Sequence, residues 1–461
     1  MQAPPQSDHQ LFRIILVRRE AEEILLASHG TRFALPVIEI PRWGRIAQET
    51  TAAVENRYGI RVCCLFTRDA ASGGDFEHPV HCVLLEACRP SAPCPKSMYW
   101  VPVASLSRSS FEDFAVVTDC LTKATREGAD SGPFARLGWL REVSEWVAAK
   151  ALPFGLHITG RFRQLNASST FSLIRFETDG PALWFKAVGE PNLREFPIIL
   201  ALSKCFSHFV PRVIAARPEW NGWLMVNAAG SHPDEHTKSE LWVCAAETLA
   251  TLQTASIGRT LHLLEVGSKD ARVDSLLSLV DPFFRAMAQY MEEQTKPSPA
   301  PLSSEELRAL ADEIRGLLGE FAQGSLPDTL GHLDFNPGNI LIAGTQCIFL
   351  DWTEAAVAHP FLTFSYLFEH ARRLRADRSL EELLVSCYAK AWESWADPQE
   401  IAAALDLAPL IAVFAYAAMS QAWRNPAALS NPETRTYLRS LTRRMKRESD
   451  LLRERKAICT S

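Results

Sequence analysis

The chain has 461 residues, a length that excludes a single small binding module because one domain typically holds about 150 residues. Hydrophobic residues make up 47% and charged residues 22%, which is typical of a globular protein with sizeable cores and argues against large-scale disorder. Lys and Arg total 48 against 54 Asp and Glu, so the net charge of −6 does not favour a nucleic-acid binder.

Targeting and membrane signals are weak in this sequence. The apolar run at 14–17 is too short for a secretion signal and has no basic region before it. The longest apolar run, at 407–419, is shorter than the ~20 residues that span a bilayer and contains Pro409, so we expect a buried helix there. The eleven cysteines include no CxxC pair, which argues against a zinc site. We therefore expect a cytoplasmic protein with no membrane span.

Residues 1–105 are predicted to form a small α/β unit. Its β-rich segments are 11–17, 23–27 and 80–86, and the pattern at 46–58 indicates a helix closed by Gly59. A Ser- and Arg-rich stretch then precedes two helical patterns, and we expect these to form a helical connector at 106–152.

From residue 153 the pattern changes to an antiparallel sheet followed by helices. The strand-like segments 171–177 and 182–188 flank Asp179-Gly180, a strong hairpin signal, and 223–227 is a further extended segment. Residues 239–323 are mostly helical by their period, and helical patterns return after residue 352.

The stretch 331–354 carries the most chemical information. Two short apolar runs, 340–342 and 348–350, are joined by turn-forming residues and predict a hairpin. Asn339 stands just before the first strand and Asp351 just after the second. Folding the hairpin would therefore bring these two side chains together.

An amide oxygen beside a carboxylate suits Mg²⁺, which prefers hard oxygen ligands and usually takes only one or two from the protein. Asn339 and Asp351 are therefore the predicted metal ligands. Asp334 lies five positions before Asn339, on a loop tightened by Pro337 and Gly338, and is predicted to accept a proton from a hydroxyl. Phosphoryl transfer needs this arrangement, because its chemistry is mostly positioning and charge stabilisation.

The run His332 to Asn339 (HLDFNPGN), followed by Leu350-Asp351-Trp352, resembles the HxDxxxxN motif and the following Asp of the aminoglycoside phosphotransferase/choline kinase-like family. The resemblance implies an α+β, protein-kinase-like bilobal fold, with an antiparallel-sheet N-lobe at 153–230 and a mostly helical C-lobe at 231–461. It implies that Asp334 is the catalytic base, that Asn339 and Asp351 hold Mg²⁺, and that His332 braces the catalytic loop.

The same resemblance assigns nucleotide contacts upstream. Lys186 lies in a predicted strand and Glu195 opens a helix, as expected for the lysine that contacts nucleotide phosphates and its acidic partner. Their separation, 195 − 186 = 9 positions, is short for kinases. Met225 and Asn227 belong to the segment LMVN (224–227), which resembles the hinge that meets adenine through backbone groups.

This chain also departs from the family pattern. The position of a glycine-rich phosphate loop is occupied by QLNASSTFS (164–172), which has no glycine, so phosphate contacts there would rest on Ser168, Ser169, Thr170 or backbone N–H groups. Thr363 stands where the family often has a second Asp after the DW-type segment.

Residues 11–60 resemble a Nudix domain faintly. Aligning Gly59-Ile60 with the end of the Nudix signature places Asn56-Arg57 where the metal-binding Glu pair belongs, and only Glu55 remains nearby. Without paired carboxylates there is no evident Mg²⁺ cage. We therefore expect 1–105 to be a degenerate Nudix-like α/β domain with a binding or structural role.

These observations predict an ATP- and Mg²⁺-dependent phosphotransferase, a small-molecule kinase acting on a hydroxyl of an unidentified acceptor. The sequence leaves GTP open as the phosphoryl donor. The alternative is a non-catalytic nucleotide- or metabolite-binding pseudoenzyme, suggested by the glycine-free loop and the eroded Nudix signature. Hydrolysis by the N-terminal domain is a third hypothesis, and we expect none.

Overall fold

The structure is a computed structural model that describes residues 8–20, 22–29, 32–68, 81–109, 111, 113–125, 133–375 and 377–460. The chain divides into two compact units. Unit 1 comprises Met1–Phe196 and Arg212–Asn227, and unit 2 comprises Pro197–Pro211 and Ala228–Ser461.

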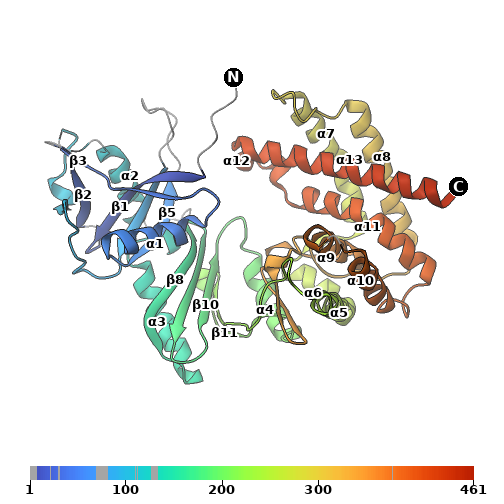
Figure 1. Ribbon diagram of the computed structural model, residues 1–461, viewed down its shortest axis with the longest axis horizontal. Helices are drawn as coiled ribbons and strands as arrows, with labels where there is room; N and C mark the ends of the chain where they lie inside the picture. The colour runs from blue at the N-terminus through green and yellow to red at the C-terminus, as the bar shows by residue number, and fades with distance from the viewer. Residues whose placement is uncertain are drawn as a thin grey trace. The chain divides into compact units, whose positions relative to one another are not determined.

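Unit 1 begins with a mixed seven-stranded sheet (Figure 1). Its strands are β1 (His9–Arg18), β2 (Glu23–His29), β3 (Arg32–Ala34), β4 (Val37–Pro41), β5 (Val62–Arg68), β6 (His81–Ala87) and β7 (Met98–Pro102). β1 pairs in parallel with β6 and antiparallel with β2 and β4. Helix α1 (Ile46–Tyr58) ends at Gly59, whose φ of 69° is the left-handed conformation that glycine adopts readily. The predicted strands and helix of this region are confirmed, apart from Val80, which lies outside the described residues.

A second sheet of unit 1 follows two helices, α2 (Phe114–Thr125) and α3 (Trp139–Ala151). It has five strands in the order β11-β12-β10-β9-β8, and every pairing is antiparallel, as predicted. The strands are β8 (Ile158–Ser168), β9 (Phe171–Thr178), β10 (Leu183–Val188), β11 (Val213–Arg217) and β12 (Gly222–Val226).

The two sheets of unit 1 share one hydrophobic core through α2 and α3. Trp139 of α3 is fully buried and contacts Phe185 of β10 and Trp220, with ring centroids 5.9 and 4.8 Å away. The side chain of Gln164 in β8 both accepts from and donates to the backbone of Cys64 in β5, each bond at 2.8 Å. A buried amide that satisfies a strand backbone in this way ties the sheets together without leaving polar groups unpaired.

Unit 2 is mostly helical. The helix α4 (Glu195–Cys205) begins in unit 1 and continues into unit 2; the helices that follow are α5 (Ser239–Ser256), α6 (Thr260–Glu265), α7 (Val273–Glu292), α8 (Ser304–Gln323), α9 (Pro360–Arg375), α10 (Arg378–Lys390), α11 (Pro398–Met419), α12 (Pro426–Leu429) and α13 (Pro432–Thr460). The long α13 packs against α7, α8 and α11 (Figure 1). These helices and the antiparallel sheet of unit 1 confirm the predicted α+β class.

Helix α11 contains the apolar run that the sequence analysis singled out. Within the part of the chain that the structure describes, it is the one helix long and apolar enough to cross a bilayer, and 67% of that apolar window is buried inside the structure. Burial of this helix among other helices accounts for its composition, so the predicted buried helix at 407–419 is confirmed.

Two small sheets in unit 2 position the segment that contains the predicted catalytic residues. β14 (Thr329–His332) and β17 (Ala355–Ala358) pair antiparallel, with β13 (Lys269–Ala271) parallel to β17. Between β14 and β17 the chain forms the hairpin of β15 (Ile340–Ala343) and β16 (Gln346–Phe349). This arrangement confirms the predicted hairpin.

Candidate active site

The open end of the β15–β16 hairpin brings the two predicted metal ligands to one place. Ile340 is paired with Phe349, and the next residue, Leu350, donates its backbone N–H to the Asn339 carbonyl at 2.8 Å. Asn339 accepts this hydrogen bond and Asp351 directly follows the residue that donates it, so both residues lie at the same end of the hairpin. The short helix at Pro337–Asn339, whose Pro sits at its first turn, directs the chain into β15.

Asp334 is held mainly through its backbone. Its carbonyl accepts from Asn339 Nδ2 at 2.9 Å and from the Asn336 N–H at 2.9 Å. Its carboxylate Oδ1 accepts from Asn336 Nδ2 at 3.1 Å, and the side chain is half-buried. The loop is thus fixed while the carboxylate stays accessible to a substrate.

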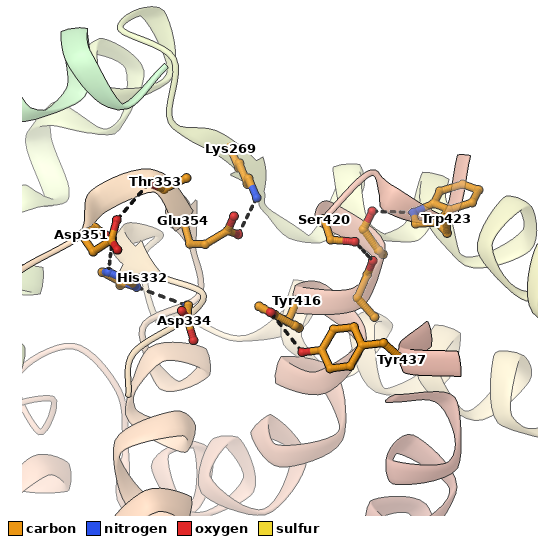
Figure 2. Close-up of polar contacts among 12 residues, drawn as sticks. Lys269, His332, Asp334, Asp351, Thr353, Glu354, Tyr416, Ser420, Trp423 and Tyr437 are labelled. Carbon is orange, nitrogen blue, oxygen red and sulfur yellow. Dashed lines mark hydrogen bonds and ion pairs between the residues drawn. The ribbon is translucent and has the colours of Figure 1, made fainter. Parts of the chain in front are cut away.

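His332 links Asp334 to Asp351 (Figure 2). The ring is buried, its Nδ1 accepts from the Asp334 N–H at 3.2 Å, and its Nε2 donates to the Asp351 carbonyl at 2.8 Å. Both ring nitrogens have partners when the proton is on Nε2, so the two hydrogen bonds favour that tautomer. The side chain therefore braces both ends of the catalytic segment.

Thr363 supports the same histidine from α9. Its Oγ1 accepts the His332 N–H at 2.9 Å, and the side chain is fully buried. A Cβ at Gly331 would lie 3.0 Å from this oxygen, so the glycine permits a close approach. Thr363, the residue that departs from the family pattern, thus accepts a hydrogen bond from the backbone of His332, beside the predicted catalytic loop. The sequence did not reveal this contact.

Asp351 adopts an uncommon backbone conformation. Its φ is 58° and its ψ 65°, in the left-handed region that few residues other than glycine occupy. Its Oδ1 accepts from Thr353 Oγ1 at 3.0 Å. Such outliers concentrate at functional sites, where the surrounding structure holds them in place. The conformation directs a carboxylate to the hairpin end that also carries Asn339.

The donor set at this hairpin end fits Mg²⁺. The Asn339 amide nitrogen is committed to the Asp334 carbonyl, which leaves Oδ1 as the atom that can bind a cation. One amide oxygen and one carboxylate match the few hard ligands that Mg²⁺ takes from proteins when phosphates supply the rest. Among the described residues, no group of three or more His, Cys, Asp or Glu forms a closed metal cage.

Sequence reasoning missed an ion pair beside the catalytic loop. Lys269 of β13, with only 7% of its side chain exposed, pairs with Glu354, and the Glu354 carbonyl accepts the Leu333 N–H at 2.9 Å (Figure 2). Burial raises the pKa of Tyr416, and the hydroxyl of Tyr437, 3.2 Å away, raises it further, followed by smaller contributions from the negative charges of Asp334 and Glu354. These residues come from distant segments, so no local motif could have revealed them.

In unit 1 the structure brings together Lys186 and Glu195. The Lys186 ammonium lies 2.6 Å from the Glu195 carboxylate, and the side chains are only 7% and 3% exposed. The ammonium also lies 5.4 Å from the ring centre of Phe171 and 5.7 Å from that of Trp223. The short spacing between the two residues is therefore compatible with the ion pair that the resemblance implied.

The region predicted to contact phosphates is a tight hairpin turn between β8 and β9. Ser168 pairs with Phe171, so Ser169 and Thr170 form the turn, and Ser168 Oγ accepts the Thr170 N–H at 3.1 Å. Gly189, which directly follows β10, donates its N–H to the Thr170 carbonyl. A Cβ on Gly189 would lie 3.2 Å from the Thr170 Cα. The turn itself contains no glycine, but Gly189, just after β10, packs closely against it.

The predicted hinge residues lie at the end of β12. Met225 is paired with Trp184 of β10 on one side and with Val213 of β11 on the other. Asn227 donates its N–H to the Ala182 carbonyl and accepts from Trp184 Nε1, both at 2.8 Å. These contacts fix the end of the strand, and the adenine contacts remain a prediction.

The helix compared with the Nudix signature presents no carboxylate pair. Glu55 of α1 is half exposed and lies 3.3 Å from Arg61, in an ion pair at the surface. The Nudix-like identity of this region stays a prediction.

Comparison with known proteins gives a family match over the segment that contains the catalytic loop. Residues 190–404 match the model of the phosphotransferase enzyme family. Over these residues, which make up less than half of the chain, the match confirms the predicted resemblance to this family and the predicted enzyme class, a small-molecule kinase. A search of curated proteins gives no match.

Solved structures similar to this chain include three phosphotransferases. A choline kinase from Cryptosporidium parvum Iowa II is 12% identical, with a TM-score of 0.49 over 69% of this chain and 97% of that one. A choline/ethanolamine kinase family protein from Mesorhizobium loti is 18% identical, with a TM-score of 0.46 over 67% and 94%. Macrolide 2′-phosphotransferase MphH from Brachybacterium faecium is 15% identical, with a TM-score of 0.42 over 65% and 97%.

Proposed function

We propose that this chain, whose residues 190–404 match the phosphotransferase enzyme family, transfers a phosphoryl group from ATP or GTP to a hydroxyl of a small molecule. The observation that carries the proposal is the segment around Asp334 and Asp351, in which one buried histidine, His332, holds both residues by their backbones. A pseudoenzyme would more often have lost Asp334 or Asp351, and both residues are present in this chain.

In this proposal Asp334 orients the acceptor hydroxyl and accepts its proton as the oxygen attacks the phosphorus. The accessible carboxylate and the hydrogen-bonded backbone of its loop suit this role, because phosphoryl transfer depends chiefly on positioning. Asn336 restricts the carboxylate through its bond to Oδ1. The acceptor oxygen would therefore meet a base that is already oriented.

Asn339 and Asp351 would hold Mg²⁺, which neutralises phosphate charge when bound. Lys186 would contact the nucleotide phosphates, with Glu195 holding its ammonium in place. Ser168 and Ser169 would approach the phosphates from the β8–β9 turn. Met225 and Asn227 would lie near the base of the nucleotide.

The first experiment is a thermal-shift titration of the full chain with ATP and GTP, each with and without Mg²⁺. A nucleotide at 100 to 1,000 times its Kd is expected to raise stability by about 3–4 kcal/mol. Asp351→Asn should remove the Mg²⁺-dependent part of the shift. The preferred nucleotide then serves in a screen of hydroxyl acceptors.

Asp334→Asn tests the base. We expect turnover to fall by about 10² to 10⁴-fold while the nucleotide shift persists. Asp312→Asn, the same chemical change at an exposed position of α8, is the control and should leave turnover unchanged. Unchanged turnover in Asp334→Asn would refute the mechanism, and nucleotide binding without transfer to any acceptor would favour the pseudoenzyme.

We infer further that residues 1–105 form a degenerate Nudix-like module that serves binding or structure, preceding a connector at 106–152. Glu55 has no second carboxylate beside it at the position of the Nudix glutamate pair, and the first sheet shares its core with the five-stranded sheet. Both observations support a non-hydrolytic role. The full chain carrying Asp334→Asn should then show no Mg²⁺-dependent cleavage of nucleoside diphosphate derivatives.

A further inference from the structure

A cavity of about 310 Å³ lies in unit 2, at one end of the three-stranded sheet β13–β17–β14. Its wall comes from the first turn of α7, from the last turn of α8 with the segment after it, and from residues just outside the strands. Phe321 and Leu326 supply apolar surface, and Asp328 and His359 supply polar groups. Neither the family motif nor the predicted catalytic residues account for this cavity.

The register of the sheet brings three polar side chains of this wall into one row. β14 and β17 pair as far as Thr329 and Ala358, so the next residues, Asp328 and His359, stand directly opposite each other. Residues opposite each other in an antiparallel pair have Cβ atoms about 4.5–5.5 Å apart. The register of β13 with β17 places Arg272 on the other side of His359. All three side chains of the row line the cavity.

Asp328 is half-buried, and within the described part of the chain its carboxylate takes part in no hydrogen bond and no ion pair. Arg272 is engaged by Asp270 instead, with its Nε and Nη2 atoms 2.9 and 2.8 Å from the two carboxylate oxygens. Burial raises the pKa of Asp328; the charge of Arg272 opposes this, and the charges of Asp270 and Asp274 raise the pKa further. A cation that enters the cavity would therefore stabilise the ionised carboxylate.

His359 is a second polar group of this wall without a partner. The residue is only 7% exposed, its Nδ1 is enclosed without a hydrogen-bond partner, and its Nε2 forms no hydrogen bond to any residue that the structure describes. Because Nδ1 is enclosed, Nε2 is the nitrogen that can meet a ligand in the cavity. Burial lowers the pKa of His359 to about 3, so the ring is neutral at pH 7. A neutral imidazole can accept a hydrogen bond from a ligand N–H group at Nε2.

The charged side chains that line the cavity sum to −1. Arg272 contributes one positive charge, and Asp274 and Asp328 contribute one negative charge each, while the neutral His359 adds none. The first turn of α7 and the last turn of α8 both belong to the wall, so the opposite charges of the two helix dipoles offset each other. This balance favours a cation over an anion.

We propose that this cavity binds a small organic cation with a planar N–H group, an amidinium or a guanidinium, which pairs with Asp328 and donates to His359 Nε2. A planar fork of N–H donors matches a carboxylate through two parallel hydrogen bonds, and its weak hydration favours entry into a partly apolar site. Phe321, whose ring stacks on that of His359 with centres 4.0 Å apart, offers an apolar surface to the body of the ligand.

The site is separate from the predicted active site. Asp328 lies four positions before His332 along β14, which corresponds to about 13 Å of extended strand. The cavity and the predicted catalytic loop are thus at opposite ends of one small sheet. The proposal does not depend on the proposed function.

Binding of benzamidine and of its neutral isostere benzamide to the full chain, measured by calorimetry without nucleotide, tests the site. We expect benzamidine to bind about 10-fold or more tightly than benzamide, because only the cation pairs with a carboxylate. Asp328→Asn should remove this preference. His359→Phe keeps an aromatic ring but removes Nε2, and should weaken benzamidine by about 5-fold. Asp312→Asn, the same change as at Asp328 but at an exposed position of α8, is the matched control and should keep the preference.

A further variant, Ala322→Phe, fills the cavity from α8 and should weaken benzamidine even if Asp328→Asn folds poorly. Asp334→Asn should leave the affinity for benzamidine unchanged, because Asp334 does not belong to the wall. Loss of binding in Asp334→Asn would place the cation in the predicted active site and overturn the proposal. Equal binding of the two compounds, no binding of benzamidine, or equal effects of Asp328→Asn and Asp312→Asn would overturn it as well.

Discussion

The two units hold the charged groups of the proposed site in different ways. In unit 1, Lys186 and Glu195 are almost completely buried and form an ion pair with each other. In unit 2, Asp334 and Asp351 remain partly accessible, and backbone hydrogen bonds through His332 set their positions. Buried pairs are sensitive to loss of one partner, whereas groups held by the backbone can lose a charge without loss of structure. Stability and activity should therefore respond differently to mutation in the two places.

The largest effect on stability is expected from Lys186→Met. The Glu195 carboxylate would stay buried and would lose the ammonium that it pairs with, and breaking such pairs typically costs about 3–5 kcal/mol. Urea denaturation followed by tryptophan fluorescence measures the change, because Trp223 lies beside the ammonium. Nucleotide-dependent turnover should fall as well.

The double variant Lys186→Met/Glu195→Leu separates the two roles of the pair. An apolar replacement of similar volume is often neutral, so most of the lost stability should return. Turnover should stay low if Lys186 contacts phosphates. Full recovery of turnover in the double variant would show that the pair is structural only.

A smaller effect is expected from His332→Phe. The ring would still pack near Trp352 and Phe335, but the Asp334 N–H and the Asp351 carbonyl would lose their partner. We expect a loss of about 1–3 kcal/mol in stability and a loss of about 10²-fold in turnover, because the loop would shift.

Thr363 offers a matched pair of variants for the same brace. Thr363→Ser keeps an oxygen for the His332 N–H and should preserve turnover, while Thr363→Val removes it and should reproduce part of the His332→Phe effect. If turnover were equal in the two variants, the brace would be irrelevant to the chemistry.

The sequence was most informative where the site is local. The hairpin at 340–349 and the residues at its two ends follow from short apolar runs and a turn, so Asn339 and Asp351 could be placed together in advance. Lys269 and Tyr416 could not, because their neighbours come from distant strands and helices that meet only after folding. The glycine beside the β8–β9 turn was missed for the same reason, since Gly189 follows another strand, β10.

The smallest effect is expected from a second buried histidine of unit 2, which sharpens the comparison with His332. His359 is buried against Phe321, with ring centres 4.0 Å apart, and its Nδ1 has no hydrogen-bond partner. Burial lowers its pKa to about 3. Between about pH 6.5 and that value the unfolded chain binds a proton that the folded chain excludes, so stability falls as pH falls, by about 1.4 kcal/mol per pH unit.

His359→Phe should remove this contribution. The difference in unfolding free energy between the wild type and the variant is expected to change by about 2 kcal/mol between pH 7 and pH 5, with the wild type losing more. His236→Phe, at a position 86% exposed, is the control and should leave the pH dependence of the wild type intact. A parallel pH dependence in His359→Phe and the wild type would show that His359 is protonated in the folded protein. Burial alone would then fail to hold a histidine neutral in this unit, and the two hydrogen bonds of His332 would be what keeps the catalytic brace in a single tautomer.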